Sequence, residues 1–160
     1  MKKYLLWIVG IIVVLLVGFQ ALNAYIYQQK QGEPQPDPYV GWNTETTPEG
    51  VTFRYPNANF GPYVSAVEWP PILTIGEEYA CGGVENVRDG ITYCRTMSAE
   101  GAAGSTYRTY EYGVGIYRIT FTLRYPQCEN YDEPRRTECI AAQSSVEEDA
   151  LAVKILSSVK

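Results

Sequence analysis

The chain has 160 residues, a formal net charge of −5 at pH 7, and no histidine. Without histidine, Ser-His and Cys-His catalysis, histidine metal sites and the usual pH switch are excluded. After residue 27 the chain carries eleven Lys and Arg against eighteen Asp and Glu. Nucleic-acid binding is therefore excluded as well, because phosphate backbones are recognised by a basic stripe.

The first 27 residues predict a transmembrane anchor. Residues 1–3 include Lys2 and Lys3, and an apolar run from Tyr4 to Tyr27 follows them. A helix over residues 5–27 would be roughly 34 Å long, enough to cross a hydrocarbon core of about 30 Å. Because flanking basic residues stay in the cytoplasm, residues 1–3 are predicted to be a cytoplasmic stub. The rest of this single-pass protein is then predicted to lie outside the cytoplasm.

A cleaved signal peptide is the alternative interpretation of the same segment. Cleavage after Ala24 or Ala21 would place Leu22 or Phe19 three residues before the cut, where small residues are usual. A retained signal-anchor is therefore favoured over cleavage. A lipoprotein is excluded, since no cysteine precedes Cys81.

Residues 28–48 are predicted to be a proline-rich linker. Their first part reads QQKQGEPQPDP, and as polyproline II these eleven residues would reach about 34 Å. Residues 49–160 are predicted to form one extracytoplasmic domain, which is large enough for a core of its own.

Alternation of apolar and polar residues predicts strands through most of this domain. In residues 116–125 one face is apolar and the other polar, and residues 106–112 precede them as a hairpin partner, with a turn at residues 113–115. Asp89-Gly90 predicts a second hairpin between residues 84–88 and 91–96. Further strands are predicted at residues 51–55 and 72–75.

The C-terminus changes to helical spacing. Ser144 and Ser145 stand three residues before Glu147 and Glu148, the pattern of a capping box, and predict one helix over residues 146–158. The predicted fold class is α+β, with an N-terminal transmembrane helix followed by a mostly antiparallel sheet covered by a C-terminal helix.

The opening strand VTFRYP at residues 51–56 and the closing EEDALAVKILSSVK at residues 147–160 carry a resemblance. Together with the antiparallel middle, they resemble the PsbP/Mog1-like α/β/α sandwich, as in small membrane-anchored uncharacterised proteins of Parcubacteria-like candidate-phylum bacteria. The tryptophan common after Tyr-Pro in that family is missing here, where the chain reads Asn57-Ala58-Asn59-Phe60. The resemblance implies a fold and carries no catalytic residue.

The four cysteines, Cys81, Cys94, Cys128 and Cys139, all follow the predicted anchor and predict disulfides. Three pairings are open, and loop entropy favours the local ones, Cys81–Cys94 and Cys128–Cys139. The first requires Gly82-Gly83 to turn the chain back, because the predicted hairpin register places Cys94 opposite Glu85 and not opposite Cys81.

Other uses of these residues are less well supported by their spacing. Zinc would need closer cysteine steps than the chain has. The acidic residues between Cys128 and Cys139 do not match a regular calcium loop, and Arg135-Arg136 would compete with the ion. No cofactor and no metal are predicted, and no group of carboxylates predicts an enzyme.

The composition stands out in its fourteen tyrosines. Arg108, Tyr110 and Tyr112 share one face of their predicted strand, and the neighbouring strand already supplies a core. This triplet is predicted to be a solvent-facing contact patch, since exposed tyrosines favour binding; the alternative is tyrosine packing within the sheet.

The predicted function is a non-enzymatic binding or assembly module held at the membrane by residues 4–27, with an unknown protein or envelope partner. A structural subunit of a cell-envelope complex is the alternative.

Overall fold

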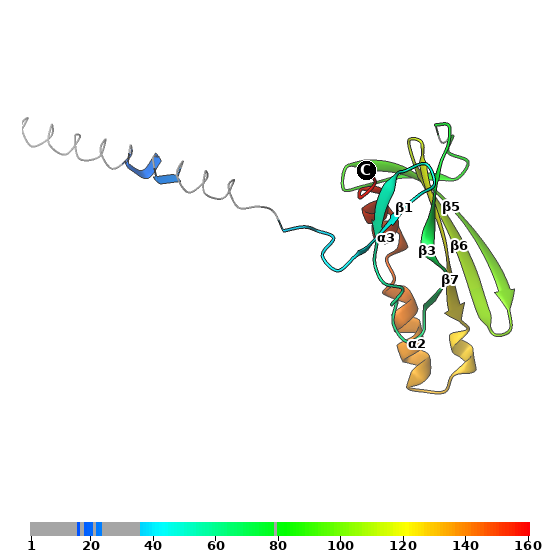
Figure 1. Cartoon of the computed structure of the whole chain (residues 1–160). Coiled ribbons are helices and arrows are strands. Elements are labelled where there is room, and N and C mark those ends of the chain that lie inside the picture. The colour runs from blue at the N-terminus through cyan, green and yellow to red at the C-terminus, as the bar shows by residue number, and fades with distance from the viewer. Residues whose placement is uncertain (1–15, 17, 21, 24–35, 79) are drawn as a thin grey trace, which may run out of the picture. The chain divides into compact units, whose positions relative to one another are not determined.

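The computed structural model describes residues 16, 18–20, 22–23, 36–78 and 80–160 (Figure 1). It contains two compact units, residues Met1–Pro38 and Tyr39–Lys160. Most of the predicted anchor lies outside the described residues, as do residues 28–35 of the predicted linker. Among the residues that are described, no helix has the length and hydropathy of a membrane span.

The second unit is built on a five-stranded antiparallel sheet in the order β3-β7-β6-β5-β4. A separate hairpin precedes it. Its strands and those of the hairpin are β1 (Asn43–Thr46), β2 (Thr52–Tyr55), β3 (Ser65–Ile75), β4 (Val84–Arg88), β5 (Ile91–Ala102), β6 (Ser105–Val114) and β7 (Tyr117–Pro126). The predicted antiparallel sheet is confirmed. The unit begins earlier than predicted, because β1 pairs with β2 and Trp42 packs against the core.

The predicted faces of β7 are confirmed by burial. Ile119, Phe121 and Leu123 are completely buried, while Arg124 on the other face is exposed. This alternation follows from the period of two in a strand, which turns successive side chains to opposite faces. We call the buried side of the sheet the core face.

The strands are longer than predicted at two places. β5 continues from the predicted end at residue 96 to Ala102, and Ala103-Gly104 form the turn that leads to β6. β3 runs from Ser65 to Ile75 with Pro70 and Pro71 inside it. Prolines are tolerated there because β3 is an edge strand and its register with β7 shifts between Ala66 and Ile72.

Three helical segments follow the sheet: η1 (Cys128–Asn130), α2 (Arg135–Ser144) and α3 (Glu148–Leu156). The predicted C-terminal helix is confirmed as α3, whereas α2 is a helix that the sequence pattern did not predict. The predicted capping box is wrong. Ser144 and Ser145 donate hydrogen bonds back to the carbonyls of Ala141 and Ala142, so they end α2 and do not cap α3.

The two disulfides join Cys81 to Cys94 and Cys128 to Cys139, with Cα–Cα distances of 5.4 and 5.6 Å. The local pairing is thus confirmed. The chain bends at residues 82–83 as the first pair requires. A Cβ atom at Gly83 would lie 2.1 Å from the Arg95 carbonyl oxygen, so only glycine fits this close approach.

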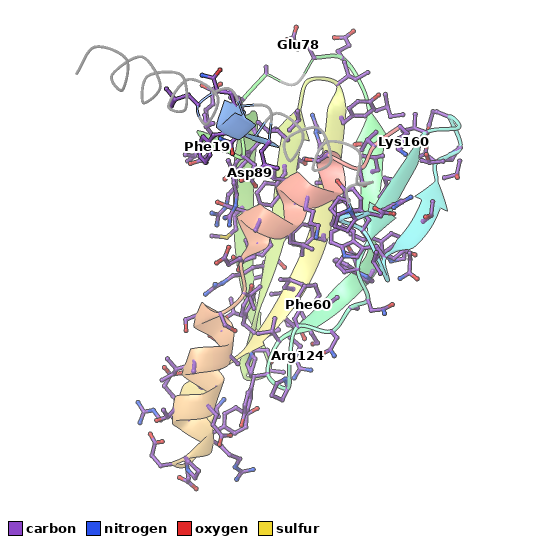
Figure 2. The ribbon with its side chains drawn as sticks, turned by 90° about the vertical axis from the view of Figure 1, so that its left-hand side faces the viewer. Phe19, Phe60, Glu78, Asp89, Arg124 and Lys160 are labelled. Atoms are coloured by element: carbon purple, nitrogen blue, oxygen red, sulfur yellow. A yellow bond between two sulfur atoms is a disulfide. The ribbon has the colours of Figure 1, made fainter. Side chains whose placement is uncertain are left out.

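Figures 1 and 2 show α2 and α3 on the same side of the sheet, with α3 lying across the strands and α2 beyond their ends. The buried side chains of α3, including Ile155 and Leu156, pack with β2, β6 and β7. In the second unit, α2 and α3 therefore form one helical layer on one face of the five-stranded sheet. A second helical layer, as in an α/β/α sandwich, is not found among residues 36–78 and 80–160, which the structure describes.

Candidate functional site

The predicted contact patch does not lie at the surface. Tyr110 is 1% exposed and Tyr112 is 0% exposed. In the register of β6 with β7, Tyr110 faces Phe121 and Tyr112 faces Ile119. Because directly paired residues of antiparallel strands share a face, both tyrosines belong to the core face. The prediction that they point to solvent is therefore wrong.

The hydroxyls of the buried tyrosines all meet two carboxylates at the start of α3. Tyr110 and Tyr125 donate to Glu148 Oε1 at 2.8 and 2.6 Å, and their phenol oxygens lie 3.2 Å apart. We call the residues that meet in this way the tyrosine–carboxylate cluster: Tyr93, Tyr110, Tyr112, Tyr125, Glu148 and Asp149.

The Asp149 carboxylate accepts hydrogen bonds from two tyrosines of this cluster and from Arg95, which lies outside it. Asp149 accepts from Tyr112 at 2.6 Å, from Tyr93 at 2.9 Å and from the Arg95 guanidinium at 3.2 Å. Burial, and the hydrogen bond to Asp149, raise the pKa of Tyr112 above its ordinary value. The phenols therefore stay protonated, and they act as donors that hold the first turn of α3 on the sheet.

The same two carboxylates also interact favourably with the N-terminus of α3. Glu148 and Asp149 are in the first turn of α3, where the helix dipole favours negative charge. The cluster thus satisfies the polar ends of buried tyrosines and the N-terminus of a helix together. Its first role is structural, because every phenol in it already has a carboxylate partner.

Arg108 is the member of the predicted patch that borders a hollow. Its guanidinium carbon lies 4.4 Å from the centre of the Tyr125 ring, a cation–π contact. No carboxylate of the described residues lies within ion-pair distance of Arg108. The hollow has a volume of about 380 Å³, and we call it the Arg108 hollow. Its lining is Thr106, Arg108, Tyr125, Pro126, Gln127, Cys128, Glu129, Ile140, Gln143 and Ser144.

Its wall is positioned by the second disulfide. Cys128 and Cys139 connect η1 to α2, and the Gln143 side chain donates to the Pro126 carbonyl at 2.6 Å. These contacts hold α2 against the end of β7. Ile140, which is 53% exposed, presents an apolar surface on the same wall. Two fixed elements and one disulfide therefore shape the hollow.

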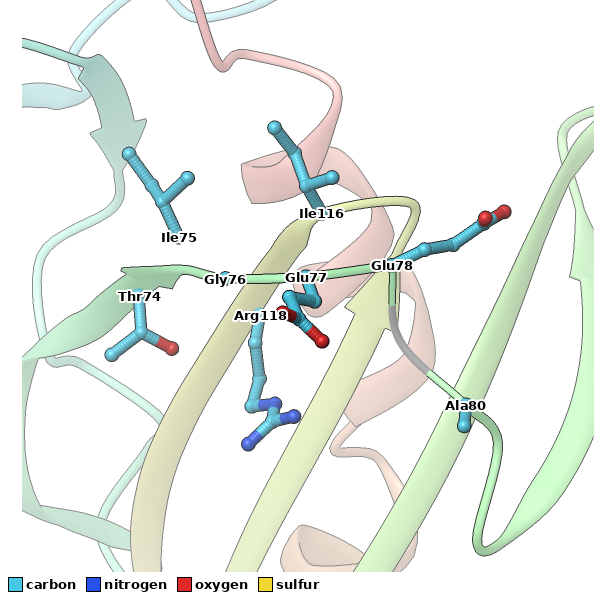
Figure 3. A pocket seen from close by; sticks show the side chains of 8 residues that line it. All are labelled: Thr74, Ile75, Gly76, Glu77, Glu78, Ala80, Ile116 and Arg118. Atoms are coloured by element: carbon cyan, nitrogen blue, oxygen red, sulfur yellow. The ribbon is translucent and has the colours of Figure 1, made fainter.

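A second hollow of about 500 Å³ lies where β3 ends, next to the β6–β7 turn (Figure 3). Figure 3 shows Glu77 and Arg118 extending to the same side, and Glu78 pointing away from them. Arg118 already has a carboxylate partner, since its Nε lies 3.5 Å from Glu111 Oε1. Its charge is thus neutralised from within the sheet, unlike that of Arg108.

A third hollow of about 300 Å³ lies between the loop at Asn59-Phe60 and the junction of α2 with α3. Its lining includes Val146, Glu147 and Leu151 and contains no basic side chain. Among the three, the Arg108 hollow alone combines a cation without a carboxylate partner, amide and hydroxyl donors, and an aromatic floor.

Sequence reasoning found Arg108 but missed the other side chains around it. Gln127 and Gln143 lie 16 residues apart in sequence and line the same hollow because α2 packs on the end of β7. The capping-box prediction used Glu147 and Glu148 and gave Asp149 no role. A usable signal was present, because buried tyrosines need acceptors for their hydroxyls, and the acidic pair is the nearest candidate before the apolar helix.

Comparison with known proteins identifies no relative: the chain matches no family model, no curated protein and no solved structure.

Proposed function

We propose that this protein is a membrane-anchored, extracytoplasmic binding module without enzymatic activity, and that its ligand binds in the Arg108 hollow. The anchor is proposed from the apolar run at residues 4–27, and its orientation from Lys2 and Lys3. The two disulfides support an oxidising compartment for the domain. A relationship to the PsbP/Mog1-like proteins stays a proposal based on the two ends of the domain.

The observation that carries the proposal is the position of Arg108. It is half-buried, stacked on Tyr125, and placed beside a hollow of about 380 Å³. This volume falls within the usual range of about 300–1,000 Å³ for ligand sites. The Tyr125 hydroxyl is fixed by Glu148, so the ring below Arg108 is held in place before any ligand arrives. Such preorganisation lowers the entropy cost of binding.

The lining indicates a class of ligand. The Arg108 guanidinium, the Gln127 amide and the Thr106 hydroxyl can hold an anionic group, and the Tyr125 ring and Ile140 offer apolar contact. The Gln143 amide and the Ser144 hydroxyl already donate to backbone carbonyls, and Glu129 adds one carboxylate to the lining. The proposed ligand is therefore a small amphipathic anion, or a chain end that presents a carboxylate next to an apolar side chain.

Anilinonaphthalene sulfonate is a suitable probe, because it joins a sulfonate to aromatic rings. Its fluorescence should rise on binding to the wild-type domain, and Arg108→Gln should weaken binding by about tenfold or more, the effect of losing a charge-assisted hydrogen bond. Arg124→Gln is the matched control, since Arg124 lies on β7 with its exposed side chain on the opposite face. Equal affinities of the two variants would contradict the proposal.

The topology has its own test. A reporter fused after Lys160 should be active only outside the cytoplasm. A cytoplasmic signal would reverse the proposed orientation without bearing on the hollow.

One observation favours the alternative, a structural subunit of a cell-envelope complex. Val84 and Val87 on β4 are 63% and 70% exposed, which leaves apolar side chains along an outer strand. A subunit of this kind would bury that strand against a neighbour, and Val87→Lys would then release the protein from the complex.

A further inference from the structure

One edge of the sheet is left open along half of a strand. β5 has twelve residues, but β4 pairs only with residues 91–95. Beyond Arg95 the outer side of β5 has no neighbouring strand among the described residues. We call residues 96–102 the open edge. The last six of these residues are all exposed.

The fold prevents β4 from covering this edge. The chain bends away at residues 82–83, and the Cys81–Cys94 disulfide holds it beside the part of β5 that is already paired. Gly83 makes the bend possible, because a side chain there would collide with the Arg95 carbonyl. The chain just before the first residue of β4 is thus fixed covalently to β5, close to where the open edge begins.

The hairpin turns show which backbone groups point outward. Arg88 pairs with Ile91 across one two-residue turn, and Ala102 pairs with Ser105 across the other. Residues that flank a two-residue turn exchange both of their hydrogen bonds, and the direction alternates along a strand. The N–H and C=O groups of Met97, Ala99 and Gly101 therefore point away from β6.

The two edges of the sheet are protected very differently. Proteins blunt exposed edges with prolines, bulges and charges. At the other edge, β3 contains Pro70 and Pro71 and two register shifts. The open edge has no proline, its register with β6 is continuous, and its one charged residue is Glu100. The unpaired N–H and C=O groups of such an edge can form hydrogen bonds with another β-strand.

We propose that this partner is the open edge of a second copy of the chain, so that two sheets join through β5 in an antiparallel dimer. The pairing would place Ala99 opposite Ala99 of the other copy, Met97 opposite Gly101, and Ser98 opposite Glu100. Each long side chain then faces a small one, and no like charges oppose each other.

Neighbouring registers are worse. A pairing centred on Glu100 sets two carboxylates opposite each other, which destabilises the sheet. A pairing centred on Ser98 brings Gly101 opposite Arg95, where β4 already occupies the edge. A pairing shifted by one residue turns the outward N–H and C=O groups away from their partners. The strand is thus self-complementary in one register.

Cysteine cross-linking of the full-length chain in detergent tests this pairing. Paired Cα atoms of this type lie about 5.5 Å apart, which a disulfide can bridge. Ala99→Cys should therefore form a covalent dimer on mild oxidation at least about tenfold faster than Val87→Cys, because pairing raises the effective thiol concentration. Val87 is the matched control: it lies on β4 with an exposed side chain and outside the proposed pairing. Equal rates for the two variants would overturn the inference.

A charge substitution separates this contact from association through the N-terminal segment. Ala99→Lys sets two ammonium groups opposite each other in the proposed pairing. Analytical ultracentrifugation should therefore show a monomer for Ala99→Lys and a dimer for Val87→Lys. Circular dichroism would confirm that both variants fold. A monomeric wild-type protein, or a dimer that survives Ala99→Lys, would show that the open edge is not the contact. These outcomes do not depend on the Arg108 hollow, which the sulfonate probe tests separately.

Discussion

Alkaline pH should unfold the domain steeply because of its buried tyrosines. Tyr110, Tyr112 and Tyr125 are at most 1% exposed. Burial is the main cause that raises the pKa of each of them, and their carboxylate partners raise it further. In the unfolded chain the same phenols ionise near a pKa of about 10. The folded state therefore keeps protons that the unfolded state releases.

The sign and size of the effect follow from linkage. A pKa that is raised in the folded state gives stability that is complete below about pH 10 and is lost as the pH rises further. Each phenol contributes about 1.4 kcal/mol per pH unit above that point, so three contribute about 4 kcal/mol per unit. Since domains of this size are stable by about 5–15 kcal/mol, unfolding is expected within a few pH units above 10.

The assay follows tyrosinate absorbance and far-ultraviolet circular dichroism together on residues 39–160. The absorbance change of the buried tyrosines should coincide with the loss of circular dichroism in one cooperative step, after the solvent-accessible tyrosines have ionised. Tyr112→Phe removes one of these protons, so the free energy of unfolding should fall with pH less steeply by about 1.4 kcal/mol per unit. Ionisation of every tyrosine in residues 39–160 with intact secondary structure would refute the argument, because it would show that the buried phenols reach solvent without unfolding.

Three further predictions concern stability and covalent structure. Tyr112→Ala should lower the free energy of unfolding by about 3–5 kcal/mol, as for other buried aromatic residues, whereas Tyr112→Phe, which keeps the ring, should cost about 1.5–3 kcal/mol in thermal or urea unfolding. Gly83→Ala should lower it by about 1–3 kcal/mol through overpacking, and Gly82→Ala is its control, because a Cβ atom at residue 82 meets nothing within 4 Å. Alkylation without reductant should add no mass, since both cysteine pairs are joined; a gain of two or more adducts would disprove the pairing.

Much of the sheet could be predicted from local pattern. The Asp89-Gly90 turn fixes the β4–β5 register, and alternation identifies the core face of β7. These features are local, because a strand's periodicity and a two-residue turn depend on adjacent residues. Because the pattern is local, it could not identify the buried face of β6. Alternation separates its two faces but does not say which is buried, and the tyrosine face was assigned to solvent.

Long-range contacts explain the remaining differences. α2 has few apolar residues, and it is held by the Cys128–Cys139 bridge and by Gln143 on the end of β7, neither of which a helical periodicity reveals. The Arg108 hollow exists only after α2 has packed against the sheet. A hollow built from three separated segments leaves no pattern in any one of them, so its donors could not be grouped from the sequence.

The two disulfides have different consequences for the two proposed contact surfaces. Cys81–Cys94 fixes the end of β4 and so keeps the open edge free, whereas Cys128–Cys139 joins η1 to α2 and so shapes the wall of the Arg108 hollow. Removing the first bridge would release the chain before Val84 from β5, and this chain could then compete with a second copy for the unpaired backbone groups. Removing the second bridge would loosen α2 and so disturb the wall of the Arg108 hollow. Each bridge lies beside a different surface, so we expect self-association and anion binding to be separable by removing one cysteine pair at a time.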